Sequence, residues 1–299
     1  MLGKPFLLFL VVLFGIGTVF PQNVVENEVR LTTPLAPWTI VINGQNLEIK
    51  QVGLKPGSKS AYILMVDETT ELNVSIYIEP ADQCKSSDGC RDYVLNLGNP
   101  AWGKYENLAK SSVGDFSYFE FYRPEVRGQP LKVQDMYAQH VSNGFWVDLH
   151  ISKVLYKPED KRLFENMVKS LKFIPKSAKP DAAAVLAADL QKVAENWLSD
   201  WDAGRCRESY TALTSFSKEA VSEPKWIEYC IATNTGLGKI KSRRVIASTV
   251  VKSLSSKPGY SAATFRFESD FDKRPLRPEF ISLTREKDGR WMISNYFVQ

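Results

Sequence analysis

The spacing of apolar residues predicts antiparallel strands in the first half of the chain. Apolar and polar positions alternate over residues 38–50 and 131–154, and an Asn-Gly pair interrupts each run. Because both residues tolerate positive φ, Asn43-Gly44 and Asn143-Gly144 each predict the tight turn of a β-hairpin. Two more alternating runs predict further strands at residues 61–66 and 72–78.

A helical spacing replaces this alternation near Pro158. Proline suits the first turn of a helix, and Glu159 and Asp160 oppose the positive end of the helix dipole. The apolar face of the predicted helix consists of Leu163, Phe164, Met167 and Leu171. Phe173-Ile174 is expected to close this first domain.

The second half of the chain is predicted to begin with helices and to end with strands. A long helix is expected at residues 183–201, a shorter one at about 206–220 and a third from Ser222. Past Gly238 the period changes to two, which predicts strands near 243–254, 260–271, 278–286 and 290–298. Three helices followed by a curved antiparallel sheet form an α+β half-cone.

One group of motifs lies at the end of the first domain. It comprises Phe145-Trp-Val-Asp-Leu-His-Ile-Ser-Lys153, Tyr156, Pro158-Glu-Asp160 and Ser170-Leu-Lys-Phe173. Together these residues resemble bacterial domains of the PsbP-like fold. The resemblance implies an α/β/α sandwich with an antiparallel sheet for residues 30–174, and it implies no known catalytic centre.

A second group of motifs occurs in order between Ala194 and Tyr296. It comprises Ala194-Glu-Asn-Trp-Leu198, Asp202-x-Gly204, Trp226, Gly236-Leu-Gly238, Ser242-Arg243, Phe271, Glu279, Asp288-Gly-Arg-Trp291 and Tyr296. This set resembles the bacterial family called domain of unknown function 4019, within the nuclear-transport-factor-2-like superfamily. The resemblance implies a cone-shaped domain at residues 183–299 in an exported protein, without a known activity.

The N-terminus has the layout of a secretory signal. Lys4 is followed by an apolar run of 15 residues from Phe6 to Phe20. Spanning a bilayer takes about 20 residues, so a cleaved signal at 1–22 is favoured over a permanent anchor. We therefore expect a periplasmic or secreted protein with no transmembrane segment after cleavage. Residues 175–182, which contain two prolines, are expected to link its two domains.

The four cysteines fit export, because an even number in an oxidising compartment indicates disulfides. Three pairings are possible. Since domains usually fold as units, we expect Cys84 to pair with Cys90 and Cys206 to pair with Cys230. The first pair encloses a polar segment whose Gly89 permits a tight reversal. A zinc site is the alternative, but neither spacing fits the close ligand pairs that zinc sites use.

The composition and motifs exclude several classes of function. The net charge of +4 is too small to indicate nucleic-acid binding, and two histidines are too few for a histidine-rich metal site. The sequence contains no Gly-x-Ser-x-Gly elbow, phosphate loop, dinucleotide fingerprint or His-Glu-x-x-His motif. No cofactor and no metal are therefore expected.

Two groups of polar residues remain as weak candidate sites. In the strand at 145–154, Asp148 and His150 share one face. A two-residue turn at Asn143-Gly144 would place Tyr137 opposite His150 and Gln139 opposite Asp148. These side chains suit acid–base chemistry, a weak metal site or ligand binding, and a polar sheet face that is hydrogen-bonded or solvated is the alternative.

The second candidate is Glu279, which shares a strand face with Ile281 and Leu283 and so points into the predicted cone. A carboxylate in an apolar pocket would act as a base. The alternatives are a salt bridge, with Arg243 as a partner, or an exposed strand end beyond Pro278. Arg243 and Tyr296 are also candidate binding residues. A cone interior filled by Trp197, Trp226, Phe265 and Phe267 would exclude an enzyme site there.

Three hypotheses about function follow. The first is an exported, non-enzymatic binding or accessory protein of the cell envelope, with an unknown protein or small molecule as its partner. The second is a hydrolase or isomerase with a site at Glu279. The third is a structural assembly factor whose surfaces, rather than pockets, carry the function.

Overall fold

The computed structural model describes residues 27–32, 36–43, 47–54, 60–251 and 260–299. The expected signal at 1–22 and Gly44 lie outside the described residues. Contacts divide the described chain into two compact units. The N-terminal unit contains Val24–Pro180 and Val245–Pro258, and the C-terminal unit contains Asp181–Arg244 and Gly259–Gln299.

The N-terminal unit contains an antiparallel sheet of seven strands in the order β3-β4-β5-β9-β8-β7-β6. Their bounds are Leu47–Leu54 for β3, Ala61–Asp67 for β4, Leu72–Pro80 for β5, Glu106–Val113 for β6, Phe116–Arg123 for β7, Val133–Ser142 for β8 and Phe145–Lys153 for β9. Strands β8 and β9 form the hairpin predicted at Asn143-Gly144, and Asn143 and Gly144 have φ values of 52° and 77°. This prediction is confirmed.

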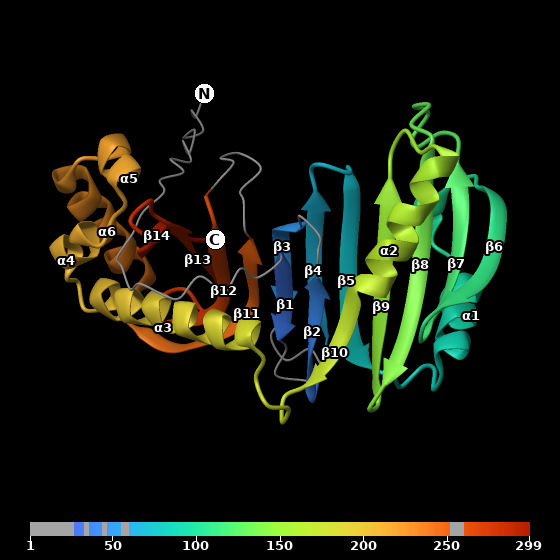
Figure 1. Ribbon diagram of the computed structural model, residues 1–299, viewed down its shortest axis with the longest axis horizontal. Coiled ribbons are helices and arrows are strands. Elements are labelled where there is room, and N and C mark those ends of the chain that lie inside the picture. The colour runs from blue at the N-terminus through green and yellow to red at the C-terminus, as the bar shows by residue number, and fades with distance from the viewer. Residues whose placement is uncertain (1–26, 33–35, 44–46, 55–59, 252–259) are drawn as a thin grey trace. The chain divides into compact units, whose positions relative to one another are not determined.

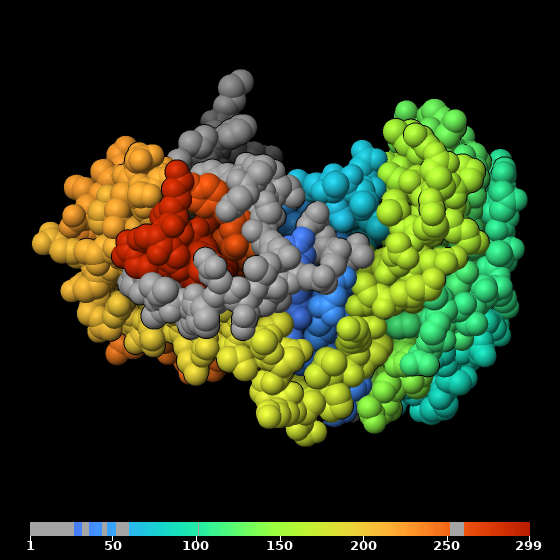
Figure 2. Space-filling model, in the orientation of Figure 1, coloured from blue at the N-terminus to red at the C-terminus, as the bar shows by residue number. Residues whose placement is uncertain are grey.

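A second layer covers one face of this sheet (Figure 1). It consists of β1 (Glu28–Thr32), β2 (Trp38–Asn43), β10 (Leu171–Pro175), the end of β11 (Ile240–Val251) and the helix α2 (Lys161–Ser170). Figure 2 shows α2 at the surface on this side. The core between the layers joins alternate buried residues of six of the seven strands, all except the exposed edge strand β6, to Phe164, Met167 and Val168 of α2. The helix predicted after Pro158 is therefore confirmed, with a short 3-10 turn, η2 (Pro158–Asp160), before it.

The opposite face of the sheet is covered only at one end. The helix α1 (Ser87–Leu97) and the 3-10 turn η1 (Pro100–Trp102) pack there against β7 and β8. Ser86 caps α1 by accepting a hydrogen bond from the backbone N–H of Gly89 at 3.1 Å. Trp102 packs against Phe119 and Phe121, which are buried on this face. The rest of the face is left without a covering helix among the described residues.

The hairpin predicted at residues 38–50 is wrong. Strand β2 pairs with β1 and β10, whereas β3 pairs with β4 in the seven-stranded sheet. Residues 40–42 of β2 are all buried. A continuous apolar run of this kind is typical of a strand that has partners on both edges and is covered on both faces. The strand β1, which the alternation did not reveal, supplies one of these partners.

The C-terminal unit contains four helices and an antiparallel meander. The helices are α3 (Ala182–Asp202), α4 (Cys206–Thr211), α5 (Ser215–Ala220) and α6 (Glu223–Leu237). The strand order is β11-β12-β13-β14, with β12 at Ala262–Phe271, β13 at Arg277–Arg285 and β14 at Trp291–Val298. The predicted α+β class with antiparallel sheets is confirmed. The single helix expected at 206–220 is instead broken, because the backbone of Leu213 forms a bridge with Ile293 of β14.

Candidate functional site

The uncovered face of the seven-stranded sheet carries ordered rows of side chains. Across β8 and β9, Tyr137 lies opposite His150 and Gln139 lies opposite Asp148, in the register predicted from the Asn143-Gly144 turn. Strand β5 continues both rows, with Ser75 opposite His150 and Tyr77 opposite Asp148. The structure therefore brings together all four residues that the sequence pattern had grouped.

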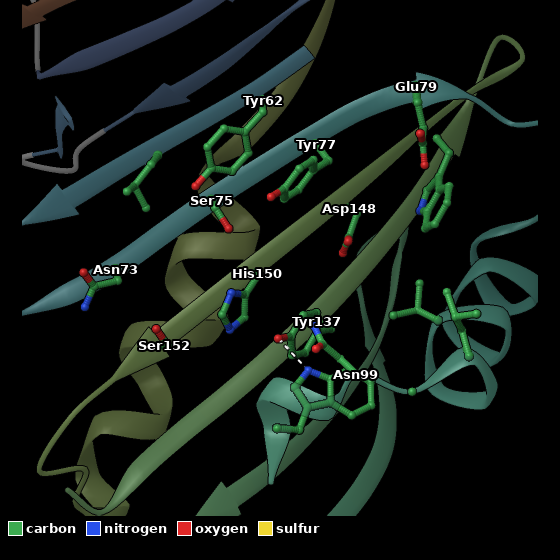
Figure 3. A pocket seen from close by; sticks show the side chains of 16 residues that line it. Tyr62, Asn73, Ser75, Tyr77, Glu79, Asn99, Tyr137, Asp148, His150 and Ser152 are labelled. Carbon is green, nitrogen blue, oxygen red and sulfur yellow. Dashed lines mark hydrogen bonds between the residues drawn. The ribbon is translucent and has the colours of Figure 1, made fainter. Parts of the chain in front are cut away.

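Small side chains at the centre of this face leave a hollow of about 620 Å³. Ser75 lies between larger neighbours on β4 and β9, because it is opposite both Leu64 and His150. Asn73 and Ser152 continue the low part of the floor, and the end of α1 with Asn99 forms one wall (Figure 3). A volume of this size falls within the usual range for small-molecule sites.

Aromatic side chains surround the low floor. Tyr62 and Tyr77 stand side by side on β4 and β5, with ring centroids 4.4 Å apart, and Tyr77 is 45% exposed (Figure 3). Trp102 and Trp146 line the hollow from the side that α1 covers. Two rings standing open to the hollow make a surface on which a flat or cationic group can rest.

Tyr137 is held rigidly and has no free ring face. Its ring stacks on His150 at 4.2 Å and on Phe119 at 5.1 Å, with interplanar angles of 10° and 9°. Its hydroxyl accepts a hydrogen bond from Trp102 Nε1 at 2.9 Å, which Figure 3 marks with a dashed line. Burial raises the pKa of Tyr137, and the carboxylate of Asp135 adds to this shift. Tyr137 is therefore a neutral, fixed part of the floor.

Asp148 is the acidic group of the floor. Its Oδ1 accepts a hydrogen bond from Gln139 Nε2 at 2.7 Å, and Trp146 Nε1 in turn donates to Gln139 Oε1 at 2.6 Å. Burial raises the pKa of the Asp148 carboxyl to about 6, although the bond from Gln139 opposes the shift. Asp148 is thus a carboxyl group with a raised pKa that lies beside an open hollow.

His150 has a hydrogen-bond partner in addition to the predicted neighbour Tyr137. Its Nε2 lies 2.8 Å from Oδ1 of Asp135, a fully buried residue that sequence reasoning missed. Arg123 holds the same carboxylate from the other side, with Nε donating to Oδ2 at 2.6 Å and Nη2 donating to Oδ1 at 2.9 Å. Asp135 alternates with Tyr137 and Gln139 on β8, so period-two spacing from these residues was the signal that pointed to it.

Glu279, the second candidate, lies in a closed network in the C-terminal unit. Its buried carboxylate accepts hydrogen bonds from Arg243, Ser269 and Tyr296, the last at 2.8 Å. Arg243 also donates to Asp202, at 2.7 and 3.1 Å. The geometry is that of the salt-bridge alternative, and it includes both other candidates, Arg243 and Tyr296.

Large aromatic side chains fill the interior beside Glu279. Trp197, Trp226, Phe265 and Phe267 are each at most 3% exposed. The ring of Tyr296 lies 5.1 Å from Trp197 and 4.6 Å from Trp201. These four side chains were expected to show whether the interior is open or filled. In the described part of this unit they fill the interior.

The cysteines form the two predicted disulfides, one in each unit. Cys84 bonds to Cys90 with Cα atoms 5.0 Å apart, and Cys206 bonds to Cys230 with Cα atoms 5.8 Å apart. The segment around Gly89 is not the tight reversal that was expected, because it forms the first turn of α1. A Cβ atom at Gly89 would come within 3.0 Å of the capping Ser86 Oγ, so the glycine leaves room for the cap.

The described residues form neither a cluster of metal ligands nor a helix that could cross a membrane. Nowhere between residues 27 and 299, outside the undescribed gaps, do three His, Cys, Asp or Glu side chains come together as a metal site would require. Over the same described ranges, the helices are too short or too polar to cross a membrane.

Comparison with known proteins found one family model that matches part of the chain. Residues 193–296 match the model of the family described as "Protein of unknown function (DUF4019)". The resemblance stated from the motifs between Ala194 and Tyr296 is thus confirmed. Among curated proteins, no match to the sequence was found.

Similar solved structures include three distant ones. Cyanobacterial PsbP (CyanoP) from Synechocystis sp. PCC 6803 is 12% identical with a TM-score of 0.35, covering 52% of this chain and 98% of its own. A protein from Bacteroides thetaiotaomicron VPI-5482 is 10% identical with a TM-score of 0.36, covering 88% of each chain. LpqN, described as involved in cell envelope biogenesis of Mycobacterium tuberculosis, is 12% identical with a TM-score of 0.23, covering 54% of this chain and 86% of its own. At these scores none of the three defines what this chain does.

Proposed function

We propose that this chain is an exported, non-enzymatic binding protein whose N-terminal unit takes up a small molecule in the hollow over β5, β8 and β9. The observation that carries the proposal is the hollow of about 620 Å³ itself. Aromatic rings stand around its rim, and a small number of polar side chains form its floor. This combination is typical of small-molecule sites.

The polar side chains of the floor suit recognition because protein partners already orient them. Gln139 holds Asp148, and the pair of Asp135 and Arg123 holds His150. A ligand would therefore meet groups that lose little conformational entropy on binding. In the C-terminal unit, by contrast, Arg243, Ser269 and Tyr296 already occupy the carboxylate of Glu279, which favours a supporting role for that unit.

Export is supported by the cysteine pairs. All four cysteines of the sequence are in disulfides, each within one unit. Such bonds persist in oxidising compartments outside the cytoplasm. They agree with the signal layout around Lys4 and Phe6–Phe20, which makes a periplasmic or secreted location part of the proposal.

Filling the hollow tests the proposal. In the full mature chain, Ser75→Trp places a large ring on the floor, because Ser75 is a small residue on the lining face of β5. Ser112→Trp is the matched control, since Ser112 lies on the exposed edge strand β6. Thermal unfolding is then measured with a small-molecule library of amines, sugars, amino acids and carboxylic acids.

We expect at least one compound class to raise the melting temperature of the wild type and of Ser112→Trp, but not of Ser75→Trp. A ligand present at 100 times its Kd stabilises the folded state by about 2.7 kcal/mol, which such an assay resolves. Stabilisation that persists in Ser75→Trp would place binding elsewhere. No stabilisation of the wild type by any class would favour the assembly-factor hypothesis instead.

A further inference from the structure

We infer that the hollow of the N-terminal unit selects organic cations, that is, ligands with a quaternary or primary ammonium group. The inference rests on the proposed function and adds the chemical class of the ligand. It follows from the charges of the lining, from the hydrogen bonds of Asp148 and from the aromatic rings at the rim.

The ionisable side chains of the lining favour a positive ligand. Glu79 and Asp148 contribute carboxyl groups, and His150 is the one residue of the set that can become positive. Lysine and arginine are absent from the described residues that line the hollow. The nearest arginine in the network, Arg123, is already paired with Asp135. An anionic ligand would meet two carboxyl groups, and the described lining offers it no lysine or arginine.

Asp148 has capacity for a cationic partner. Within the described chain, its hydrogen bond comes from the neutral amide of Gln139 and reaches only Oδ1. Desolvation raises the pKa of the half-buried Asp148 carboxyl to about 6, and the bond from Gln139 and the charge of the neighbouring His150 oppose the shift only in part. An ammonium group in the hollow would add a counter-charge directly at this carboxylate, where the described lining supplies no lysine or arginine.

The rings at the rim provide the second element of cation recognition. Tyr77 lies directly opposite Asp148 across β5 and β9, and Tyr62 stands beside Tyr77. A group next to the Asp148 carboxylate is therefore also next to an aromatic ring. Aromatic faces attract quaternary ammonium groups through the ring quadrupole, and a neutral group of the same shape lacks this attraction.

Proton binding at Asp148 should compete with the cation. The groups that face Asp148 are Gln139 on β8, Tyr77 and Glu79 on β5, and His150 on β9. Since the pKa of Asp148 is about 6, its carboxylate is mostly ionised at pH 7.5 and mostly protonated at pH 5. The affinity for a cation should therefore fall by up to about tenfold between pH 7.5 and pH 5.

A matched pair of probes tests the inference by titration calorimetry on the full mature chain. Choline is compared with 3,3-dimethylbutan-1-ol, which has the same shape without the charge, and 1,4-diaminobutane serves as a primary amine. We expect at least one of the two cations to bind. If choline binds, the neutral alcohol should bind with an affinity at least about tenfold lower. Ser75→Trp should abolish the binding.

Two variants locate the effect. Asp148→Asn should weaken cation binding about tenfold and remove its pH dependence, whereas the same change at the exposed Asp115 should do neither. Circular dichroism checks that both variants are folded. If the pH dependence survives in Asp148→Asn, it arises from another group such as His150 and the assignment to Asp148 is wrong.

The remaining outcomes separate this inference from the proposed function. If neither cation binds but a neutral compound binds the wild type and not Ser75→Trp, the hollow is a ligand site and the inference of a cation is overturned. Equal affinity for choline and its neutral analogue overturns it in the same way. If no compound distinguishes the wild type from Ser75→Trp, the proposed function fails as well.

Discussion

Replacing Arg243 by methionine should remove the central cation of the buried network in the C-terminal unit. Arg243 donates hydrogen bonds to Glu279 and to Asp202, so the substitution removes the counter-charge that these two carboxylates share. Glu279 is fully buried, and the side chains of Arg243 and Asp202 are 14% and 17% exposed. Methionine keeps most of the side-chain volume, so the loss is mainly electrostatic.

The expected cost is about 3 kcal/mol of unfolding free energy. Breaking a buried ion pair by removing one partner typically costs about 3–5 kcal/mol, and partial exposure of Asp202 favours the lower end. Arg207→Met is the matched control. Arg207 pairs with Glu223 at the surface, where its side chain is 74% exposed. Exposed pairs of this kind contribute roughly 0–1 kcal/mol.

Hydrogen exchange with mass spectrometry measures the two variants, because it resolves the C-terminal unit from the N-terminal one. A cost of about 3 kcal/mol corresponds to roughly 150-fold faster exchange of the protected amides of α3 and β13. Urea unfolding followed by tryptophan fluorescence gives the same quantity for the chain as a whole. Both measurements should leave Arg207→Met close to the wild type.

A double variant decides whether the unpaired charge is the cause. Glu279→Gln removes that charge, so Arg243→Met combined with Glu279→Gln should be more stable than Arg243→Met alone by at least about 1 kcal/mol. If Arg243→Met lowers the unfolding free energy no more than Arg207→Met does, the ion pair is not needed to keep Glu279 buried. If Glu279→Gln instead leaves stability unchanged and abolishes ligand binding, Glu279 belongs to a working pocket.

Three further predictions concern the covalent chain. Non-reducing peptide mapping should find only the Cys84–Cys90 and Cys206–Cys230 pairs. Cys206→Ser should lower the melting temperature more than Cys84→Ser, because loop closure contributes about 3.5 kcal/mol for the longer loop and about 2.4 kcal/mol for the shorter one. The reverse order of melting temperatures would show that native packing outweighs loop length. Mass spectrometry of protein from its native host should show a mature N-terminus roughly between residues 16 and 26, and an intact Met1 on membrane-bound protein would indicate an anchor. Limited proteolysis should cut first within the exposed segment 175–181. Because Ala247–Val250 of β11 pair with β1, the two fragments should co-elute under native conditions. Separate elution would contradict that pairing.

The part of the candidate site that the sequence predicted is the part built by one local turn. Asn143-Gly144 fixes the register of β8 against β9, and period-two alternation then determines which side chains face each other. Both steps involve residues that are close in the sequence. This is why the pairs of Tyr137 with His150 and of Gln139 with Asp148 were predicted correctly without any knowledge of the rest of the sheet.

The hollow itself could not be predicted in this way, because its walls come from distant segments. Strand β5 pairs with β9 although α1 and three strands lie between them in the chain. No local signal specifies such a long-range pairing, so the positions of Ser75 and Tyr77 beside His150 and Asp148 were out of reach. The wall formed by α1 was missed for another reason, since the polar residues around Cys84 and Cys90 are typical of a turn.

Asp148 and Glu279 show why an inward acidic residue in a strand does not define its own role. Both lie on strand faces that the alternation identified, but Glu279 is fully buried whereas Asp148 is half-buried. Glu279 receives Arg243 from β11 and hydroxyl groups from β12 and β14, so its charge is compensated within the fold. Asp148 accepts a hydrogen bond from a neutral amide, has His150 rather than a lysine or arginine beside it, and faces open space. The difference lies in the permanent counter-charge that other strands supply to Glu279, and a cationic ligand could take that place at Asp148.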